Sequence, residues 1–302
     1  MATVLIFGPT GRVGSAIARS IHKYGVGKVF LAMRDPAKEI PGLSKTYERI
    51  SADLTDSESI RSAAQKSGAK RAFIYATRST DGMRATIEAL ASGGVEFVVF
   101  LSSSTISEAG GDVRQIPKEA FIPWGHAQIE INLEEVFGQN FVRIRPGYFA
   151  SNSLRWKTMI QAGRVKLVYP TATLDWIAPD DIGHVAAAAL ARGPLEGTVI
   201  GLYGPQTLSQ QDAVAAIGSA IGKHIDIEEV TEDEGPEMYV KEMGYPAESL
   251  ARTLIQSLKN RIEGDSTVEG YHEAVSNIKK YTEKEPMTFE AWTREHTDEF
   301  RE

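Results

Sequence analysis

The chain of 302 residues contains no cysteine. Disulfide bonds, thiolate nucleophiles and cysteine-ligated metal ions are therefore excluded, and the composition is compatible with a reducing compartment. The sequence also lacks a run of about 18 apolar residues, the length that a transmembrane helix requires. Its first residues show neither the basic nor the apolar segment of a secretory signal. We therefore expect a cytoplasmic protein without a membrane partner.

Basic residues are scarce in the last part of the chain. Residues 223–302 hold 20 of the 40 acidic residues but only 10 of the 33 basic ones. Nucleic-acid binding needs a basic surface, so this distribution argues against a nucleic-acid partner. A solvated helical surface explains the acidic residues more simply.

Short apolar runs alternate with segments of helical periodicity along the chain. The expected strands are Val4–Phe7, Val29–Met33, Tyr47–Asp53, Ala72–Ala76, Phe97–Leu101, Phe141–Ile144 and Leu174–Ala178. The expected helices are Arg12–Tyr24, Ser57–Lys66, Gly82–Ala91, Asp180–Arg192, Leu208–Ile221, Glu234–Gly244, Ala247–Arg261 and Phe289–Phe300. Such alternation is typical of a parallel sheet, and near-continuous apolar strands fit a sheet that is covered on both faces.

Three glycines separate the first expected strand from the first expected helix. Gly8 would allow the tight turn, Gly11 the approach of a pyrophosphate to the backbone, and Gly14 the close packing of helix on strand. Phosphates would sit at the helix N-terminus, where free N–H groups and the helix dipole favour anions. This turn supplies the candidate cofactor residues Gly8, Thr10, Gly11, Arg12, Val13 and Gly14.

The pattern predicts an α/β fold: a Rossmann-type doubly wound parallel sheet with a smaller, helix-rich C-terminal substrate lobe. Residues 1–150 are expected to form the nucleotide-binding core. Residues 151–302 are expected to complete the sheet and to form the smaller lobe.

The end of the second strand indicates which dinucleotide would bind. NAD sites place an acidic residue there for the ribose 2′-hydroxyl. Here Arg34 stands at that place, where its guanidinium would bind a 2′-phosphate, and Lys38 would add a second positive charge. Asp35 follows Arg34, where turn formation is its simpler role. We therefore expect NADP(H) as the cofactor.

The ends of later strands supply further candidate cofactor contacts. Asp53 and Leu54 follow the third strand, where such a pair often contacts adenine. Thr77 follows the fourth strand, and Ser102 and Ser103 follow the fifth. Ligands of open α/β sheets lie at these ends, although each hydroxyl residue is equally suited to cap the next helix.

Several motifs of this sequence resemble the NmrA-like branch of the atypical short-chain dehydrogenases/reductases. The motifs are Gly8–Gly14, Arg34–Lys38, Ala52–Asp56, His126–Glu130, Arg143–Phe149, Asp175–Gly183 and Met287–Trp292. The resemblance implies a Rossmann domain, a preference for NADP(H) and a small substrate lobe. It also implies that the loop with Pro146, Gly147, Tyr148 and Phe149 passes near the nicotinamide. It does not imply a single activity, because the family includes redox sensors as well as reductases.

The catalytic pattern of the parent superfamily is absent. That pattern requires Tyr-x-x-x-Lys on the helix after the fifth strand. Here Ile122 stands at the Tyr position and His126 at the Lys position, and residues 118–134 contain no tyrosine. Carbonyl reduction with a tyrosine acid is therefore doubtful. Two hypotheses remain. Either hydride is transferred to an electrophile that needs no strong acid, or NADP(H) is bound without turnover.

Candidate substrate-side residues complete the prediction. Tyr148 and His126 are the candidate catalytic residues, although a packing tyrosine and a structural or cofactor-orienting histidine are open alternatives. The candidate substrate contacts are Trp124, Asn152, Trp156, Asp175 and Trp176, with core packing as the alternative for the tryptophans. No His/Asp/Glu spacing is typical of a metal site, so we expect none.

The sequence thus predicts an NADP(H)-dependent tailoring oxidoreductase, or a cyclase or isomerase that uses the same cofactor. Its small-molecule substrate would be a bulky aromatic or nitrogen-containing compound, such as an imine or iminium intermediate of secondary metabolism. The alternatives are a non-catalytic NADP(H) redox sensor that regulates a partner, and a quinone or enone reductase.

Overall fold

The computed structural model describes residues 2–40, 42–43, 47–193, 198–263 and 270–301. The chain divides into two compact units. Unit 1 comprises Met1–Pro146, Pro179–Leu202 and Ser276–Glu285, and unit 2 comprises Gly147–Ala178, Tyr203–Val275 and Pro286–Glu302. The first change of unit lies between Pro146 and Gly147, near the boundary predicted at residue 150, and Pro179–Leu202 then returns to unit 1.

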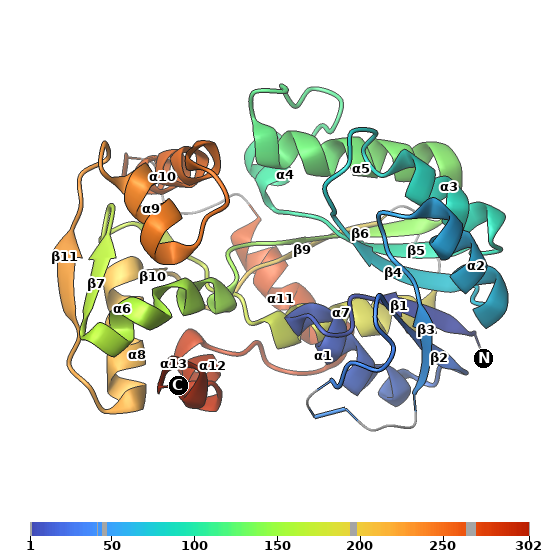
Figure 1. The fold of residues 1–302 in the computed structure, drawn as a ribbon, viewed down its shortest axis with the longest axis horizontal. Coiled ribbons are helices and arrows are strands. Elements are labelled where there is room, and N and C mark those ends of the chain that lie inside the picture. The colour runs from blue at the N-terminus through green and yellow to red at the C-terminus, as the bar shows by residue number, and fades with distance from the viewer. Residues whose placement is uncertain (1, 41, 44–46, 194–197, 264–269, 302) are drawn as a thin grey trace. The chain divides into compact units, whose positions relative to one another are not determined.

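Unit 1 is built on a parallel sheet of seven strands (Figure 1). The strands are β1 Val4–Phe7, β2 Val29–Met33, β3 Glu48–Ser51, β4 Arg71–Tyr75, β5 Phe97–Leu101, β6 Phe141–Pro146 and β9 Val199–Leu202. Their order is β3-β2-β1-β4-β5-β6-β9, so the direction of winding reverses between β1 and β4. This topology confirms the predicted doubly wound α/β fold. Ligands of such sheets bind at the carboxyl ends of the strands beside the reversal.

Helices cover both faces of this sheet. Their bounds are α1 Arg12–Ser20 with the 3₁₀ turn η1 Ile21–Tyr24, α2 Ser57–Ser67, α3 Arg84–Ser92, α4 Thr105–Glu108, α5 Phe121–Phe137 and α7 Pro179–Arg192. Helices α1 and α7 pack together on one face, and α2, α3 and α5 lie on the other (Figure 1). Strands β1 and β2 are buried along their whole length, as expected between two helical layers.

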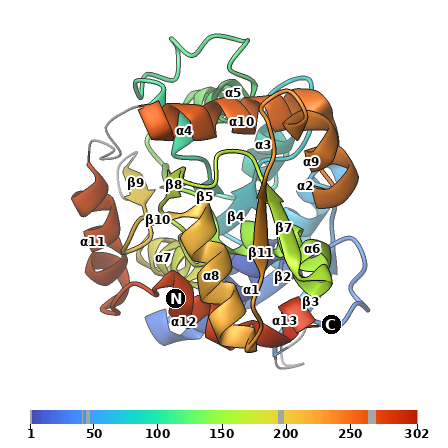
Figure 2. The ribbon, with the colours of Figure 1, turned by 90° about the vertical axis from the view of Figure 1, so that its left-hand side faces the viewer.

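Unit 2 contains most of the helix-rich C-terminal part of the chain (Figure 2). Its elements are η2 Ala150–Trp156, α6 Lys157–Ala162, β7 Arg164–Leu167, β8 Thr173–Leu174, β10 Leu208–Ser209, α8 Gln210–Ile221, β11 Asp226–Glu229, α9 Gly235–Met243, α10 Glu248–Glu263, α12 Phe289–Glu295 and α13 Thr297–Arg301. Strand β7 pairs with β11 in parallel, and β8 pairs with β10 in antiparallel orientation. The boundary between the units falls within α11 Tyr271–Thr282.

Aromatic rings form the centre of the unit 2 core. The ring centroids of Trp176 lie 5.7 Å from Trp156 and 4.8 Å from Phe289, and Phe289 lies 6.0 Å from Trp292. All four side chains are buried. This cluster provides unit 2 with a hydrophobic core of its own.

The structure corrects several of the expected elements. The strand expected at Leu174–Ala178 is limited to Thr173–Leu174, because Trp176 adopts a left-handed conformation with φ 42°, which ends regular strand geometry. The single helix expected at Phe289–Phe300 is divided into α12 and α13, because His296 leaves helical geometry with φ −118° and ψ 19°. Strands β7, β9 and β11 and helices α4, α6 and α11 were not predicted, and Leu208 and Ser209, which were expected to begin a helix, form β10. In the described ranges, no helix has the length and apolar character needed to cross a membrane.

Candidate functional site

The glycine turn has the geometry that its sequence predicts. Gly8 has a φ of 66°, a left-handed conformation that favours glycine, and its carbonyl accepts the Gly11 N–H at 3.0 Å. A Cβ atom on Gly14 would lie 2.2 Å from the Gly8 carbonyl oxygen, so only glycine permits α1 to begin this close to β1. The turn therefore forms a tight backbone cradle at the end of β1.

The N-terminus of α1 is open to an anion. Gly11 is the N-cap residue, has no side chain to accept the N–H groups of the first turn, and is exposed together with Thr10. The first turn also contains no acidic residue. Unpaired N–H groups and the positive end of the helix dipole are a suitable environment for a phosphate group.

Charged residues lie at the ends of β2 and β3. Arg34 directly follows β2 and is exposed, as is Lys38. Asp35 accepts the Ala37 N–H at 2.9 Å, so its carboxylate forms the turn that we assigned to it. Asp53 follows β3, where hydrogen bonds from the backbone and side chain of Thr55 lower the pKa of its carboxyl, with a smaller contribution from the charge of Arg34. Its carboxylate therefore stays ionised at neutral pH.

Leu54 has a different role from that of Asp53. Its side chain is buried in the core of unit 1, and its carbonyl accepts the Thr86 hydroxyl at 2.8 Å. A contact with adenine would have to come from the backbone of Leu54, and it remains a prediction.

Tyr75 is a candidate site residue that our sequence reasoning missed. It is the last residue of β4, and 37% of its side chain is exposed although the three residues before it are buried. A Cβ atom on Gly8 would lie 2.6 Å from its Cε1 atom, so the ring packs directly against the glycine turn. The sequence signal was a large aromatic residue at the end of β4, next to the point between β1 and β4 where the direction of winding reverses. We considered only small hydroxyl residues at such strand ends.

Nδ1 of His184 in α7 is one polar side-chain atom of unit 1 that is buried without a hydrogen-bond partner among the described residues. Two more are Oγ1 of Thr77, which follows β4, and Nδ1 of His126 in α5. Burial lowers the pKa of His126 to about 4, with an opposing contribution from Glu130, so the imidazole is neutral at neutral pH. Because buried polar atoms are rarely left unpaired, both atoms are suited to contact a ligand.

The serines at the end of β5 already have protein partners. The Ser102 hydroxyl donates to Glu130 Oε1 at 2.5 Å, and the Ser103 hydroxyl accepts that of Thr105 at 2.9 Å. Glu130 is fully buried and pairs with Arg145 through two hydrogen bonds of 3.0 and 2.6 Å. The cofactor contacts expected for the two serines remain predictions.

The loop that follows β6 is held by a buried carboxylate in unit 2. Asp175 accepts the Tyr148 N–H with both oxygens, at 3.0 and 3.1 Å. A Cβ atom on Gly147 would lie 2.1 Å from Asp175 Oδ2, and Phe149 forms an isolated bridge with Ile177. Asp175 thus stabilises the loop, and its expected contact with a substrate remains a prediction.

The Tyr148 ring packs edge-on against Trp176, with 5.1 Å between centroids. Burial raises the pKa of the Tyr148 phenol well above its usual value. The phenol therefore retains its proton at neutral pH and is a weaker acid than an exposed tyrosine. Its catalytic role remains a prediction.

The burial of the candidate tryptophans does not indicate a substrate-binding surface. Trp156 and Trp176 are 3% and 1% exposed within the unit 2 core, and the indole N–H of Trp176 donates to the Leu208 carbonyl at 2.9 Å. Trp124, in unit 1, is partly buried against a small cluster around Ile106. The Asn152 N–H donates to the Phe149 carbonyl at 2.9 Å. Contacts of these residues with a substrate remain predictions that their packing does not support.

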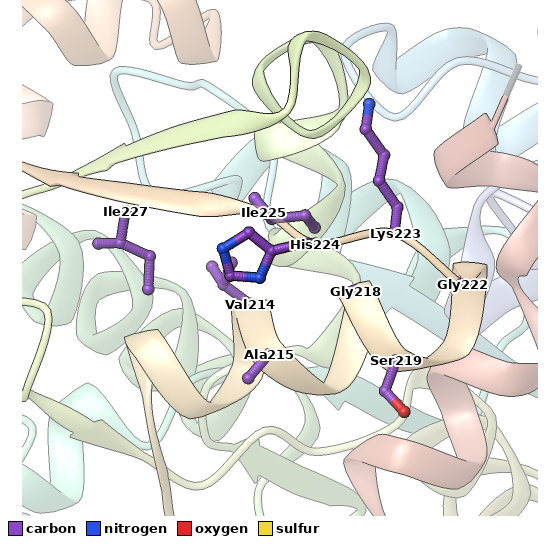
Figure 3. A pocket seen from close by; sticks show the side chains of 9 residues that line it. All are labelled: Val214, Ala215, Gly218, Ser219, Gly222, Lys223, His224, Ile225 and Ile227. Atoms are coloured by element: carbon purple, nitrogen blue, oxygen red, sulfur yellow. The ribbon is translucent and has the colours of Figure 1, made fainter.

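Unit 2 also has a surface pocket of about 490 Å³ (Figure 3). It lies between the end of α8 and the segment that leads into β11. Its lining residues are Val214, Ala215, Gly218, Ser219, Gly222, Lys223, His224, Ile225 and Ile227. None of them is among the residues predicted to bind cofactor or substrate.

The chain is similar to known proteins in sequence and in fold. A model of the NmrA-like family matches residues 1–293. The chain belongs to the NmrA-like family. It is 36% identical to the nitrogen metabolite regulation-like protein bik4 of Gibberella fujikuroi, over 96% of this chain and 95% of that protein. It is also 24% identical to the (4-alkanoyl-5-oxo-2,5-dihydrofuran-3-yl)methyl phosphate reductase of Streptomyces griseus, over 98% and 99% of the two chains.

Among solved structures, the chain resembles the NADPH-dependent quinone oxidoreductase QOR2 of Escherichia coli, solved with NADPH. The TM-score is 0.75 at 20% sequence identity, over 97% of this chain and 99% of that one. This likeness confirms the Rossmann-type fold of the NmrA-like family member described here.

Proposed function

We propose that this member of the NmrA-like family is an NADP(H)-dependent reductase of small, conjugated electrophiles. The observation that carries the proposal is the glycine cradle at Gly8 and Gly14, with the open N-terminus of α1 beside it and Arg34 at the end of β2. This set of groups has the chemistry that a dinucleotide with a 2′-phosphate requires.

The residues of unit 1 fit this cofactor along the carboxyl edge of the sheet. The first turn of α1 would bind the pyrophosphate, and Arg34 and Lys38 would bind the 2′-phosphate. The unpaired atoms of Thr77 and His126 lie on elements on the other side of the strand reversal from Arg34 and would serve the nicotinamide half. Bound NADPH would supply a hydride, and the protein would bind and orient the reactants.

The protonation states of His126 and Tyr148 favour a particular class of substrate. The neutral imidazole of His126 holds no proton on its second nitrogen near neutral pH, and burial keeps the proton on the Tyr148 phenol. A substrate that accepts hydride before it is protonated would react without such an acid. Quinones, enones and iminium ions have this property. The Streptomyces relative is named as the reductase of an acylated dihydrofuranone, and the Escherichia coli structure is titled a quinone oxidoreductase, which supports this class.

A tailoring role, on a bulky aromatic or nitrogen-containing compound, is the form of this activity that we favour. A cyclase or isomerase reaction with the same cofactor belongs to the same proposal. Both rest on the geometry of the cofactor site, since the packing of the tryptophans does not indicate a substrate.

A second candidate function is a non-catalytic NADP(H)-binding regulator. The specific observation in its favour is the relative of 36% identity that is named as a nitrogen metabolite regulation-like protein. The same cofactor site would serve as a redox sensor, and the regulator would bind NADPH without oxidising it.

Calorimetric titration with NADPH, NADP⁺, NADH and NAD⁺ tests the shared cofactor site. We expect the wild-type chain to bind NADPH and NADP⁺, which carry the 2′-phosphate, more tightly than NADH and NAD⁺. We expect Arg34→Ala to lose that preference. Arg61→Ala is the matched control, because Arg61 is an exposed arginine of α2 that pairs with Glu58 on the same helix. Absence of binding to all four dinucleotides would contradict both candidate functions.

Turnover then separates the two candidates. NADPH oxidation is followed by absorbance with a simple quinone, a cyclic enone and an aromatic iminium ion. Oxidation with any of the three supports the reductase, whereas tight NADPH binding without oxidation by all three favours the regulator.

A further inference from the structure

Tyr75 lies at the point where the order of the sheet reverses. Strand β4 pairs with β1 in the register Ile6↔Phe73, which brings Tyr75 beside Gly8 at the carboxyl ends of the two strands. The ring packs against the glycine turn, as the 2.6 Å approach to a Cβ on Gly8 shows. A dinucleotide crosses an open α/β sheet at such a reversal, so this ring lies directly beside the expected cofactor path.

The Tyr75 hydroxyl lies within electrostatic reach of the charged residues at the ends of β2 and β3. Burial raises the pKa of the phenol, the positive charge of Arg34 lowers it, and the negative charge of Asp53 raises it. The hydroxyl has no hydrogen-bond partner within the part of the chain that the structure describes, and the side chain is 37% exposed. It is therefore a free donor on a ring that packs against the end of β1, the strand next to β2.

The charges near Tyr75 have opposing effects on a 2′-phosphate. Arg34 and Lys38 would attract the phosphate, but the ionised Asp53, which is within electrostatic reach of Arg34, would repel it and favour a ribose hydroxyl instead. A neutral hydroxyl that donates a hydrogen bond to the phosphate would shift this balance without a further charge, since hydrogen bonds to ionised groups are among the strong ones.

We propose that Tyr75 determines the specificity for the 2′-phosphate: its ring supports the adenosine ribose beside Gly8, and its hydroxyl donates to the phosphate together with Arg34. This inference rests on the proposed NADP(H) site. Tyr75 would make two separate contributions to binding. Its ring would contact any adenine dinucleotide, whereas its hydroxyl would form a hydrogen bond only with a dinucleotide that carries the 2′-phosphate.

Tyr75→Phe separates these contributions, because it retains the ring on Gly8 and removes only the hydroxyl. Calorimetry would compare adenosine 2′,5′-bisphosphate with ADP, and NADPH with NADH. We expect binding of adenosine 2′,5′-bisphosphate and NADPH to weaken by about tenfold or more, and binding of ADP and NADH to change by less than about twofold. Tyr75→Ala should weaken all four ligands.

Tyr24→Phe is the matched control. Tyr24 belongs to the same unit but ends the 3₁₀ turn between α1 and β2, at the opposite edge of the sheet, and its change should leave all four affinities as they are. If Tyr75→Phe binds the phosphorylated ligands as tightly as wild type, the inference is overturned while the cofactor site stands. If the wild-type chain binds none of the four ligands, both are overturned.

Discussion

Because α1 begins so close to β1, we expect Gly14→Ala to destabilise the protein. The added methyl carbon would lie 2.2 Å from the Gly8 carbonyl oxygen, 2.7 Å from its carbonyl carbon and 3.2 Å from the Pro9 Cα atom. All three neighbours are backbone atoms, so no flexible side chain can move aside. Helix α1 would have to retreat from the turn by about 1 Å to restore ordinary van der Waals separation.

The magnitude follows from two opposing effects. Overpacking of this kind costs about 1–3 kcal/mol, and replacement of glycine by alanine within a helix returns about 1 kcal/mol. We therefore expect a net loss of about 0–2 kcal/mol in the free energy of unfolding, or a decrease of up to a few degrees in Tm. The retreat of α1 would also displace its first-turn N–H groups, so NADPH binding should weaken.

Gly125→Ala is the matched control for this prediction. Gly125 lies within helix α5 of the same unit, and a Cβ atom there meets nothing within 4 Å. This change should raise the free energy of unfolding slightly or leave it unchanged. Thermal unfolding followed by circular dichroism measures both variants. If Gly14→Ala is as stable as Gly125→Ala, the steric argument is refuted.

Two further predictions concern buried charge in unit 1. Glu130→Gln removes the carboxylate that faces Arg145 and should lower the free energy of unfolding by about 3–5 kcal/mol in a urea titration. Glu88→Gln, in an exposed ion pair, should lower it by less than about 1 kcal/mol. Equal losses for the two variants would contradict the argument. The pKa of His126 is about 4 in the folded state and 6.5 in the unfolded chain, so the unfolded state binds more protons between these values, and Tm should fall as pH decreases from about 6.5 to 4. His126→Gln should reduce this decrease in Tm, whereas His224→Gln, at an exposed histidine, should not. If wild type and His126→Gln show the same dependence of Tm on pH, His126 is not buried in its neutral form.

Several features of the fold and site could be predicted because they depend on local sequence. The apolar runs of β1, β2 and β5 and the periodicity of α1 and α2 specify alternating strands and helices. The glycine spacing requires a tight turn wherever it occurs between a strand and a helix. Gly8 and Gly14 therefore occupy the conformations that we expected, and the NmrA-like family was identified from motifs spread along most of the chain.

Short polar strands escaped prediction for a physical reason. Strand β11 has the sequence Asp226–Glu229, in which only Ile227 is a large apolar residue, and it exists because its backbone pairs with β7. The left-handed conformation of Trp176 likewise has no local signal, since a bulky residue adopts it only when packing around its ring and the bond from its indole N–H to Leu208 hold it there.

The sequence by itself determined the alternation of strands and helices from β1 to β5, the glycine turn and the cationic end of β2. Only the tertiary structure decided what the remaining side chains contact. Tyr75 meets Gly8, Ser102 meets Glu130, and Asp175 meets the backbone of Tyr148, each across a separation of 27 residues or more in the chain. Local periodicity reports which side of an element is buried, but the partners of a buried side chain depend on the packing of distant elements, which no single segment contains.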